Sequence, residues 1–486
     1  MRQSSDILIE EVGEVVEVKP PLIKLKGLPS IKVWEVIKIN EKEFLVFKFD
    51  EKFVYVFSFE RPANVKPGMI AKRTGEIFKI PVGNEFLGKI INPLGEDLET
   101  QTFIKTKEKR EIESFPPEIY QRELIREPLE TGIKIIDALF PIGRGQRELI
   151  LGDKKTGKTT IAIDMILNQK DVVSIYTIIG QRKSELPLIA NLLKSSGKTK
   201  SSIIIAAFAS DPEILQFLAP YSAMTLAEYF AEKGQDVLVI FDDLTKHAWV
   251  WREIALSLGM PPGREAYPAD IFYLHARLLE RATNIKDKGS ITAIPICETR
   301  EGDITEYIPT NLISITDGQL YLENALFQKG IKPAINIGLS VSRVGALAQR
   351  ECLKQVTKGL KLILAQHQEL KKLIQLETEL SEDSKKILKR GNILLEIFKQ
   401  EKHSPVNIAF QSILYWLVLN GKLDDLLEEN VKAFEEEFLK FIEGVYPNLQ
   451  KEIYKEGFTK ETEMLLTSAL EEFKALSDLW QKNSLK

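Results

Sequence analysis

One short stretch, residues 152–159, constrains the fold and the function of this chain more than any other. It reads Gly-Asp-Lys-Lys-Thr-Gly-Lys-Thr, and it lies between an apolar run at 148–151 and an apolar, helix-like segment at 161–167. A strand, a glycine loop that ends in Lys-Thr and a helix form the phosphate-loop pattern. The glycines let backbone N–H groups point at phosphate oxygens, and the helix N-terminus adds the positive end of its dipole. The sequence therefore predicts a nucleotide site.

Two side chains of this loop have the sharpest expected roles. Lys158 is expected to reach the β- and γ-phosphates of the nucleotide, and the Thr159 hydroxyl is expected to ligate Mg²⁺. The other expected nucleotide contacts in this stretch are Gly152, Asp153, Lys154, Lys155, Thr156, Gly157 and Thr160. The predicted ligands are ATP or ADP together with Mg²⁺.

A second nucleotide element is the apolar run 237–241, which ends in Asp242 and Asp243. A carboxylate at the end of such a strand can hold the hydration shell of Mg²⁺ beside the phosphates. We therefore expect Asp242 to be the metal residue. Asp243 is expected to cap the helix that begins near Leu244.

The composition narrows the class of protein. With 486 residues and a net charge of −4, the chain has the length of two to four domains and no excess of positive charge for nucleic acid. Cys297 and Cys352 show no metal-binding spacing, which suits a reducing compartment. The 4 histidines form no close cluster in the sequence, so we expect no histidine metal site. We also expect neither a transmembrane segment nor a signal peptide, since no long apolar run appears.

Three patterns of apolar residues follow one another along the chain. Residues 1–74 contain short runs rich in Val, Ile and Phe, which predict a small closed β-barrel. Residues 75–350 alternate apolar runs with helical stretches, which predicts an α/β P-loop (RecA-like) nucleotide-binding domain with a parallel sheet. Residues 351–486 have apolar positions at helical spacing, which predicts an α-helical bundle. The expected barrel strands are 7–18, 23–25, 33–39, 44–49 and 53–59, the expected sheet strands are 149–151, 172–179, 203–208, 237–241 and 291–296, and the expected helices are 212–233, 355–377, 384–399, 406–419, 423–445 and 460–482.

Four further segments resemble the alpha-subunit family of F-type ATP synthases. They are 141–150, 261–268, 307–318 and 332–345. The resemblance is strong from about residue 75 to residue 355 and fair on both sides. It implies an alternating hexamer with beta subunits, a gamma rotor shaft, a delta-type peripheral-stalk subunit and no nucleic-acid partner. It also implies a peripheral place on the cytoplasmic face of a prokaryotic plasma membrane, in a complex that translocates protons or sodium ions.

Two places separate the non-catalytic alpha subunit from the catalytic beta subunit, and the first is a single position. Gln181 stands where the beta subunits carry a glutamate. A glutamate can take or orient a proton of the attacking water, whereas an amide cannot act as a base. The resemblance therefore implies a nucleotide that is bound and not turned over, and an isolated chain that is nearly inactive. Glu185 is expected to be a solvated acid at the start of a helix.

The segment 340–343 matches the part of this family that reaches the neighbouring beta subunit. The resemblance implies that Arg343 is an arginine finger, whose planar guanidinium stabilises charge on the phosphoryl group transferred in that subunit. Ser340 matches a family position needed for activity, where it would shape the loop. From the residue alone, a surface arginine paired with a carboxylate is the commoner outcome for Arg343.

The chain departs from the family pattern at several predicted nucleotide contacts. At 154–155 the family usually has Arg-Gln, and this chain has Lys-Lys. Lys332, before Pro333, replaces an arginine; Gln400 keeps the first of two usual glutamines, and Lys402 replaces the second. Lys332, Pro333 and Gln400 are the expected contacts on the base side. We predict that nucleotide binding is kept and that purine selectivity or affinity is weakened.

Two segments bear on assembly. The barrel pattern begins by about residue 7, without the helical arm through which family members dock the delta-type subunit, so the attachment of the stalk stays open. The acidic turn 376–383 is, on local grounds, a solvated corner between two helices. The resemblance places the same turn toward the gamma shaft.

Two other functions are open as alternatives. A self-sufficient hexameric ATPase motor of the export type would need the glutamate that Gln181 replaces. A ring-shaped RNA translocase similar to the Rho terminator would need a basic or aromatic surface on the barrel. The expected barrel is rich in Phe and Val and carries mixed charges, so the sequence disfavours both alternatives.

Overall fold

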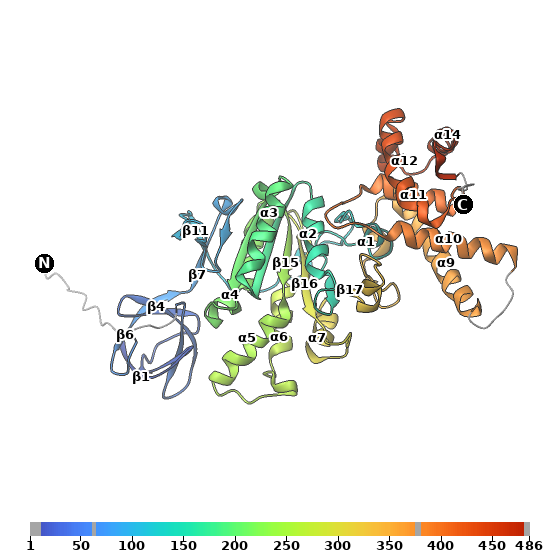
Figure 1. The fold of residues 1–486 in the computed structure, drawn as a ribbon. Helices are drawn as coiled ribbons and strands as arrows, with labels where there is room; N and C mark the ends of the chain where they lie inside the picture. The colour runs from blue at the N-terminus through green and yellow to red at the C-terminus, as the bar shows by residue number, and fades with distance from the viewer. Residues whose placement is uncertain (1–10, 61–64, 375–380, 481–486) are drawn as a thin grey trace. The chain divides into compact units, whose positions relative to one another are not determined.

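The fold is described from a computed structural model, which describes residues 11–60, 65–374 and 381–480 (Figure 1). The start of the expected strand 7–18, the end of the expected helix 355–377 and the turn residues 376–380 lie outside the described residues. The chain divides into two units. The first unit consists of Met1–Glu123, Asp171–Glu298 and Asp303–Thr316, and the second consists of Leu124–Lys170, Thr299–Gly302 and Asp317–Lys486.

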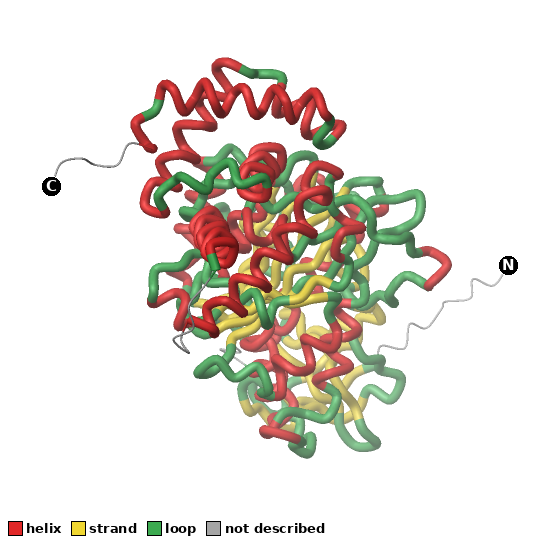
Figure 2. Tube along the Cα trace, turned by 90° about the vertical axis from the view of Figure 1, so that its right-hand side faces the viewer, coloured by secondary structure: helices red, strands yellow, loops and turns green. Residues whose placement is uncertain are grey.

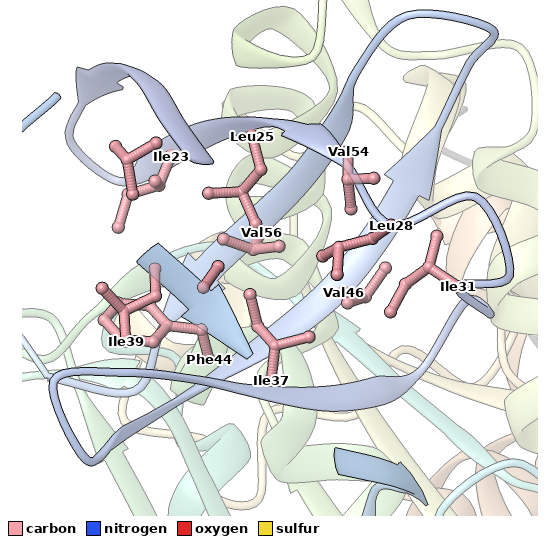
Figure 3. Packing of buried hydrophobic residues seen from close by; sticks show 12 residues of the cluster. Ile23, Leu25, Leu28, Ile31, Ile37, Ile39, Phe44, Val46, Val54 and Val56 are labelled. Carbon is pink, nitrogen blue, oxygen red and sulfur yellow. The ribbon is translucent and has the colours of Figure 1, made fainter. Parts of the chain in front are cut away.

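Six strands at the start of the first unit form a closed antiparallel barrel in the order β1-β2-β5-β4-β3-β6 (Figure 1). They are β1 (Val12–Lys19), β2 (Leu22–Gly27), β3 (Glu35–Ile39), β4 (Lys42–Phe49), β5 (Val54–Ser58) and β6 (Ile70–Ile77). Alternate apolar side chains fill the interior, as Figure 3 shows for Ile23 and Leu25 of β2 and Val54 and Val56 of β5. Closure leaves the barrel without an open strand edge. The predicted barrel is confirmed.

The remaining strands of the first unit include a largely parallel sheet with the strand order β10-β9-β8-β14-β13-β15-β16. Strands β14, β13, β15 and β16 run parallel to one another. They are near-continuous apolar runs because helices cover both faces of such a sheet. The strands of this sheet are β8 (Ile90–Ile91), β9 (Glu96–Asp97), β10 (Thr102–Phe103), β13 (Val172–Gln181), β14 (Ser202–Phe208), β15 (Asp236–Asp242) and β16 (Ile291–Glu298); β7 (Lys79–Val82) and β11 (Glu108–Glu111) pair separately.

The helices of the first unit pack against this sheet or against one another. The predicted helix 212–233 is observed as α4 (Glu213–Glu232), which is buried along most of its length and packs on β13, β14 and β15. The other helices of this unit are α3 (Leu186–Ser195), α5 (Leu244–Ser257), α6 (Ile271–Leu279) and α7 (Tyr307–Ile315). The predicted α/β domain is confirmed.

Three strands belong to the second unit. β12 (Leu149–Gly152) pairs in parallel with β17 (Gly318–Leu322), and β18 (Val341–Ser342) pairs with β17 in the antiparallel direction. Three helices accompany them along this part of the chain: α1 (Lys134–Leu139), α2 (Lys158–Asn168) and α8 (Asn324–Gln328). The pairing with β17 fixes the strand from which the phosphate loop begins.

The described part of the chain after residue 350 consists of helices and loops without a strand (Figure 2). The helices are α9 (Glu351–Ile374), α10 (Glu382–Phe398), α11 (Ile408–Leu419), α12 (Val431–Val445), α13 (Leu449–Glu456) and α14 (Lys460–Leu476). α11 is apolar all round and is buried, and α9 packs on α10, α11 and α13. The predicted helical region is confirmed. Within the described ranges, no helix combines the length and the apolar character that crossing a bilayer requires.

Two details of this helical region differ from the sequence prediction. The predicted helix 423–445 begins only at Val431. Asp424 lies in the preceding loop, where its two carboxylate oxygens accept from Nε and Nη2 of Arg390 in α10 over 2.8 and 2.7 Å. The short helix α13 was not predicted. Its 8 residues are too few to give a clear apolar period.

Candidate nucleotide site

The phosphate loop has the strand–loop–helix geometry that the sequence predicts. β12 ends at Gly152 and α2 begins at Lys158. Gly157, at the N-cap of α2, has a left-handed φ of 101°, which glycine adopts without strain. At Gly152, an added Cβ would lie 2.7 Å from the carbonyl oxygen of Leu322 in the neighbouring strand. The left-handed conformation at Gly157 and the close approach of Leu322 at Gly152 therefore require glycine at both positions.

Hydrogen bonds within the second unit hold this loop closed on itself. The Lys158 ammonium donates to the carbonyl oxygens of Gly152 and Asp153 over 2.7 and 2.6 Å. One oxygen of the Asp153 carboxylate accepts from the Thr299 hydroxyl at 2.7 Å and from the Gly302 N–H at 2.9 Å. Asp153 thus anchors the loop to 299–302, a role that the sequence did not suggest.

A cavity of about 470 Å³ opens beside this loop, within the second unit. It has the size of a typical small-molecule site. It brings together most of the predicted contacts, namely Lys155, Thr156, Gly157, Lys158, Thr159, Thr160, Lys332, Pro333 and Gln400. Gly152, Asp153 and Lys154 do not line it. The remaining lining residues are Ile133, Ile161, Asp164, Phe327, Ala334, Glu401 and Lys402.

The amide of Gln400, which lines the cavity, is engaged by the backbone. Its Oε1 accepts from the Lys134 N–H at 2.9 Å. Its Nε2 donates to the carbonyl oxygens of Gly132 and Ser404, each at 2.8 Å. Gln400 therefore lines the cavity as a fixed structural residue. Nearby, the Lys332 ammonium lies 5.0 Å from the centre of the Phe327 ring, in a cation–π contact.

Sequence reasoning found neither Asp164, which lines this cavity, nor His403, which contacts Asp164. Asp164 projects from α2, and its carboxylate accepts from the His403 N–H at 3.0 Å and contacts His403 Nδ1 at 2.7 Å. Burial raises the pKa of Asp164, and the hydrogen bonds from His403 oppose that rise. The available signal was an acidic residue on the buried, otherwise apolar side of the predicted helix.

The predicted residues of the first unit lie at the ends of β13 and β15. Gln181 Nε2 donates to the backbone carbonyl oxygen of Asp242 over 3.1 Å, and the Asp242 carboxylate accepts from the Tyr176 hydroxyl. Asp243 caps α5 as predicted, since its carboxylate accepts from the Lys246 N–H at 2.8 Å. Glu185 is exposed at the start of α3, as expected.

The segment that carries Arg343 is anchored at several points in the second unit. The Ser340 side chain is buried, and its hydroxyl accepts from the Tyr321 N–H of β17 at 3.0 Å. The Arg343 N–H donates to the Asp317 carbonyl oxygen over 2.9 Å, while the Arg343 side chain is exposed. The Ser342 hydroxyl donates to the Pro141 carbonyl oxygen over 2.6 Å. These hydrogen bonds thus fix the backbone of residues 340–343.

A buried carboxylate, Glu148, lies beneath this segment and was not predicted. Its Oε2 accepts from Gln146 Nε2 at 2.7 Å, and Gln146 Nε2 also lies 3.4 Å from the Ser342 hydroxyl oxygen. Burial raises the pKa of Glu148 well above its ordinary value, and the positive charge of Arg343 opposes that rise. The charge of the exposed Arg343 thus influences the pKa of the buried Glu148.

The sequence matches two family models. One, described as ATP synthase alpha/beta family, nucleotide-binding domain, matches residues 132–342, and the other, described as ATP synthase alpha/beta chain, C terminal domain, matches residues 349–473. A curated relative, ATP synthase subunit alpha of Wolinella succinogenes, is 45% identical over 478 residues, which cover 97% of this chain and 96% of that protein. Proteins of the same name from Sulfurovum sp. and Helicobacter pylori are each 46% identical over 476 residues, 96% of this chain and 94% and 95% of theirs.

Proposed function

Since this chain belongs to the family of ATP synthase alpha subunits, we propose that it binds ATP with Mg²⁺ without turning it over and that it supplies Arg343 to a neighbouring catalytic beta subunit. Membership of an ATP synthase makes the chain part of an ATP-synthesising, ion-transporting complex. The proposal concerns the division of labour within that complex. Its two halves are an idle nucleotide site and a residue that acts in another subunit.

The observation that carries the proposal is the amide of Gln181. It stands at the end of β13, and its Nε2 donates to the Asp242 carbonyl oxygen. An amide cannot accept a proton from an attacking water, so this position supplies no general base. Glu185, the next acid along the chain, is exposed at the start of α3 and makes no side-chain cap contact there. A bound nucleotide would therefore stay in the site without being hydrolysed.

The cavity in the second unit supports the nucleotide half of the proposal. Lys158, at the start of α2, and Lys155 offer positive charge where the phosphates would lie, and the backbone of 155–160 offers N–H groups. Mg²⁺ keeps most of its waters and needs few protein ligands. The Thr159 hydroxyl is the group of the second unit that we assign to it, and the ion would neutralise phosphate charge.

The exposure of Arg343 supports the second half of the proposal. Its backbone is held by Asp317 and, through Ser340 and Ser342, by β17 and Pro141, so this exposed residue belongs to a segment with a fixed backbone. A pre-positioned guanidinium contributes on the order of 10³–10⁵ in rate when it meets a transferring phosphoryl group. We assign that phosphoryl group to the neighbouring beta subunit.

The remaining partners follow from the same proposal. We place the chain in an alternating ring with beta subunits, around a gamma shaft, with a delta-type stalk subunit attached to the ring. The chain would then be a peripheral component at the cytoplasmic face of the plasma membrane. The family resemblance supports this assembly.

The experiment that tests the proposal measures ATP hydrolysis by the purified chain, alone and reconstituted with a beta subunit. We expect nucleotide binding and negligible turnover by the chain alone, and turnover by the mixed complex. Arg343→Ala should abolish most of the turnover, and Arg343→Lys should restore little of it, because an ammonium lacks the planar fork of a guanidinium. Turnover by the chain alone at the rate of the complex would refute the idle site.

A further inference from the structure

Glu148 is a buried acidic residue that directly precedes β12 and does not line the nucleotide cavity. Its Oε2 accepts one hydrogen bond, from Gln146 Nε2 at 2.7 Å. Its Oε1 is buried and has no hydrogen-bond partner among the residues that the structure describes. An ionised carboxylate accepts at both oxygens, and burying its charge with few donors costs free energy. A single donor therefore suits a neutral carboxylic acid.

The backbone of β18 passes close to this carboxyl group. A Cβ added to Gly318, in β17, would lie 2.4 Å from Glu148 Oε2 and 2.4 Å from the carbonyl oxygen of Val341 in β18. It would lie 2.9 Å from Glu148 Oε1. The carboxyl group and the carbonyl oxygen thus share the space that a side chain at residue 318 would fill. A carboxylate there would face another acceptor, whereas a neutral acid has an O–H group to offer it.

One side chain, Gln146, connects this carboxyl group to β18. Gln146 Oε1 accepts from the Gly143 N–H at 2.8 Å, which fixes the orientation of the amide and makes Nε2 the donor toward Glu148. The Ser342 hydroxyl donates to the Pro141 carbonyl oxygen, so the Ser342 oxygen can accept from Gln146 Nε2, which lies 3.4 Å away. The two N–H groups of one amide therefore serve the buried acid and the residue that precedes the exposed arginine.

The charged groups around Glu148 act in opposite directions. Burial raises the pKa of Glu148 well above its ordinary value, and the negative charge of Asp317, which precedes β17, adds to that rise. The hydrogen bond from Gln146 and the positive charge of Arg343, which follows β18, oppose it. Asp317 already accepts from Nε and Nη2 of Arg147 over 3.0 and 2.7 Å. An ionised Glu148 would therefore add a buried negative charge that attracts Arg343.

We propose that Glu148 is a positioning residue for Arg343, which supports the segment 340–343 as a neutral acid and on ionisation draws the guanidinium inward, away from the phosphoryl group of the beta subunit. In this step Glu148 loses one proton to the solvent, and no covalent bond of the nucleotide changes. The chain thus reduces turnover in another subunit as the pH rises. This inference rests on the proposed role of Arg343 and adds its regulation.

The test is the pH profile of ATP turnover by wild-type and Glu148→Gln chains, each reconstituted with a beta subunit. A glutamine accepts from Gln146 through its carbonyl oxygen, donates through its amide as a neutral acid would, and cannot ionise. Above the pKa of Glu148, the kcat of the wild type relative to that of the variant should fall by roughly tenfold per pH unit, as one proton is lost. The KM for ATP should not differ, because the arginine acts in the transition state.

Three further chains make the result specific. In an Arg343→Ala background, Glu148→Gln should leave the pH profile of the residual turnover unchanged, since the acid acts through the arginine. Glu471→Gln changes an exposed glutamate of α14 and should keep the profile of the wild type. Gln146→Met removes the hydrogen bond that opposes the rise in the pKa of Glu148, so its alkaline loss of kcat should begin at a higher pH. An unchanged or earlier loss in this variant would overturn the inference, whether or not Glu148→Gln folds.

The outcomes separate this inference from the proposed function. If Arg343→Ala removes turnover but the wild-type and Glu148→Gln complexes have parallel profiles up to the pH at which they dissociate, the arginine finger stands and its regulation by Glu148 is wrong. The same conclusion follows if Glu148→Gln has an equal effect in the Arg343→Ala background. If the Arg343→Ala complex keeps full turnover, the proposed function is wrong and the inference falls with it.

Discussion

At the scale of single residues, one buried hydroxyl fixes the backbone of the segment that carries Arg343. Ser340 has only 5% of its surface exposed, and its hydroxyl oxygen is the acceptor for the Tyr321 N–H of β17. The strand β18 begins at the next residue and pairs with β17. Ser340 therefore fixes the register from which the chain reaches Arg343.

We predict that Ser340→Ala lowers ATP turnover in the reconstituted complex by roughly tenfold, since a misplacement of about 1 Å can cost that much or more. The buried Tyr321 N–H loses its acceptor, and the backbone shifts to satisfy it. ATP binding by the chain itself should stay unchanged. As a control, Ser257→Ala removes an exposed hydroxyl that only bonds the preceding turn of α5. Equal activity of the Ser340 and Ser257 variants would contradict the assignment.

Two buried histidines of the first unit, His247 and His275, form a hydrogen-bonded pair. His247 Nε2 lies 3.1 Å from the Phe217 carbonyl oxygen, which can only accept, so this nitrogen carries the proton. His247 Nδ1 then accepts from His275 Nε2 at 3.2 Å. Burial lowers the pKa of His247 from 6.5 to about 4, against an opposing effect of the Phe217 contact, and burial lowers that of His275 well below 6.5.

We predict that the His247–His275 pair makes the thermal midpoint of the chain fall more steeply between pH 6.5 and 4 than it would without the pair. Above pH 6.5 both states hold neutral imidazoles; below it, the unfolded state takes up protons that the folded state excludes until about pH 4. His247 alone accounts for roughly 3 kcal/mol of lost stability over this range. His247→Asn should make the midpoint less steep in pH. Parallel pH profiles for the wild type and the variant would show that the pair does not titrate on unfolding.

At the scale of elements, a buried ion pair joins α1 to α12 within the second unit. The Lys134 ammonium donates to both carboxylate oxygens of Glu435 over 2.9 and 2.6 Å, and Lys134 is almost fully buried. Burial lowers the pKa of Lys134 and raises that of Glu435 to about 7, while the attraction between the two charges opposes both shifts. The backbone of Lys134 also binds Gln400 and Tyr415. Lys134 thus connects the cavity-lining residue Gln400 to helices α11 and α12.

We predict that Lys134→Met lowers the stability of the chain by about 3–5 kcal/mol, because Glu435 is left buried without its partner charge. The double variant Lys134→Met, Glu435→Met should be close to the wild type, since two apolar groups replace the pair. Denaturant unfolding of the two single variants, the double variant and the wild type measures the coupling. Additive losses in the double variant would mean that the pair contributes no coupling energy.

The elements themselves could be predicted from the sequence wherever their apolar pattern is local. The runs 149–151 and 237–241 became β12 and β15 because buried parallel strands are apolar throughout. The late start of α12 could not be predicted, because a local apolar pattern does not show contacts such as that between Asp424 and Arg390 of another helix. For the same reason, periodicity could not show that backbone groups far along the chain would engage the amide of Gln400.

At the scale of the whole molecule, the candidate site could be predicted in part. The loop at 152–159 and the cap at Asp243 follow from local motifs. The contact of Asp164 with His403 joins residues distant in sequence, and its signal was only an acid on an apolar helix side. The chain keeps a nucleotide cavity and places its arginine on an exposed segment. We propose that these two features serve different catalytic sites of one complex.

The most direct test of that proposal is the rate of ATP hydrolysis by the wild-type and Arg343→Ala chains, each measured alone and reconstituted with a beta subunit. The account predicts negligible turnover by either chain alone, turnover by the wild-type complex, and a loss on the order of 10³-fold or more in the Arg343→Ala complex. ATP binding by the isolated variant should equal that of the wild type. Full turnover by the Arg343→Ala complex, or comparable turnover by the wild-type chain alone, would contradict the account.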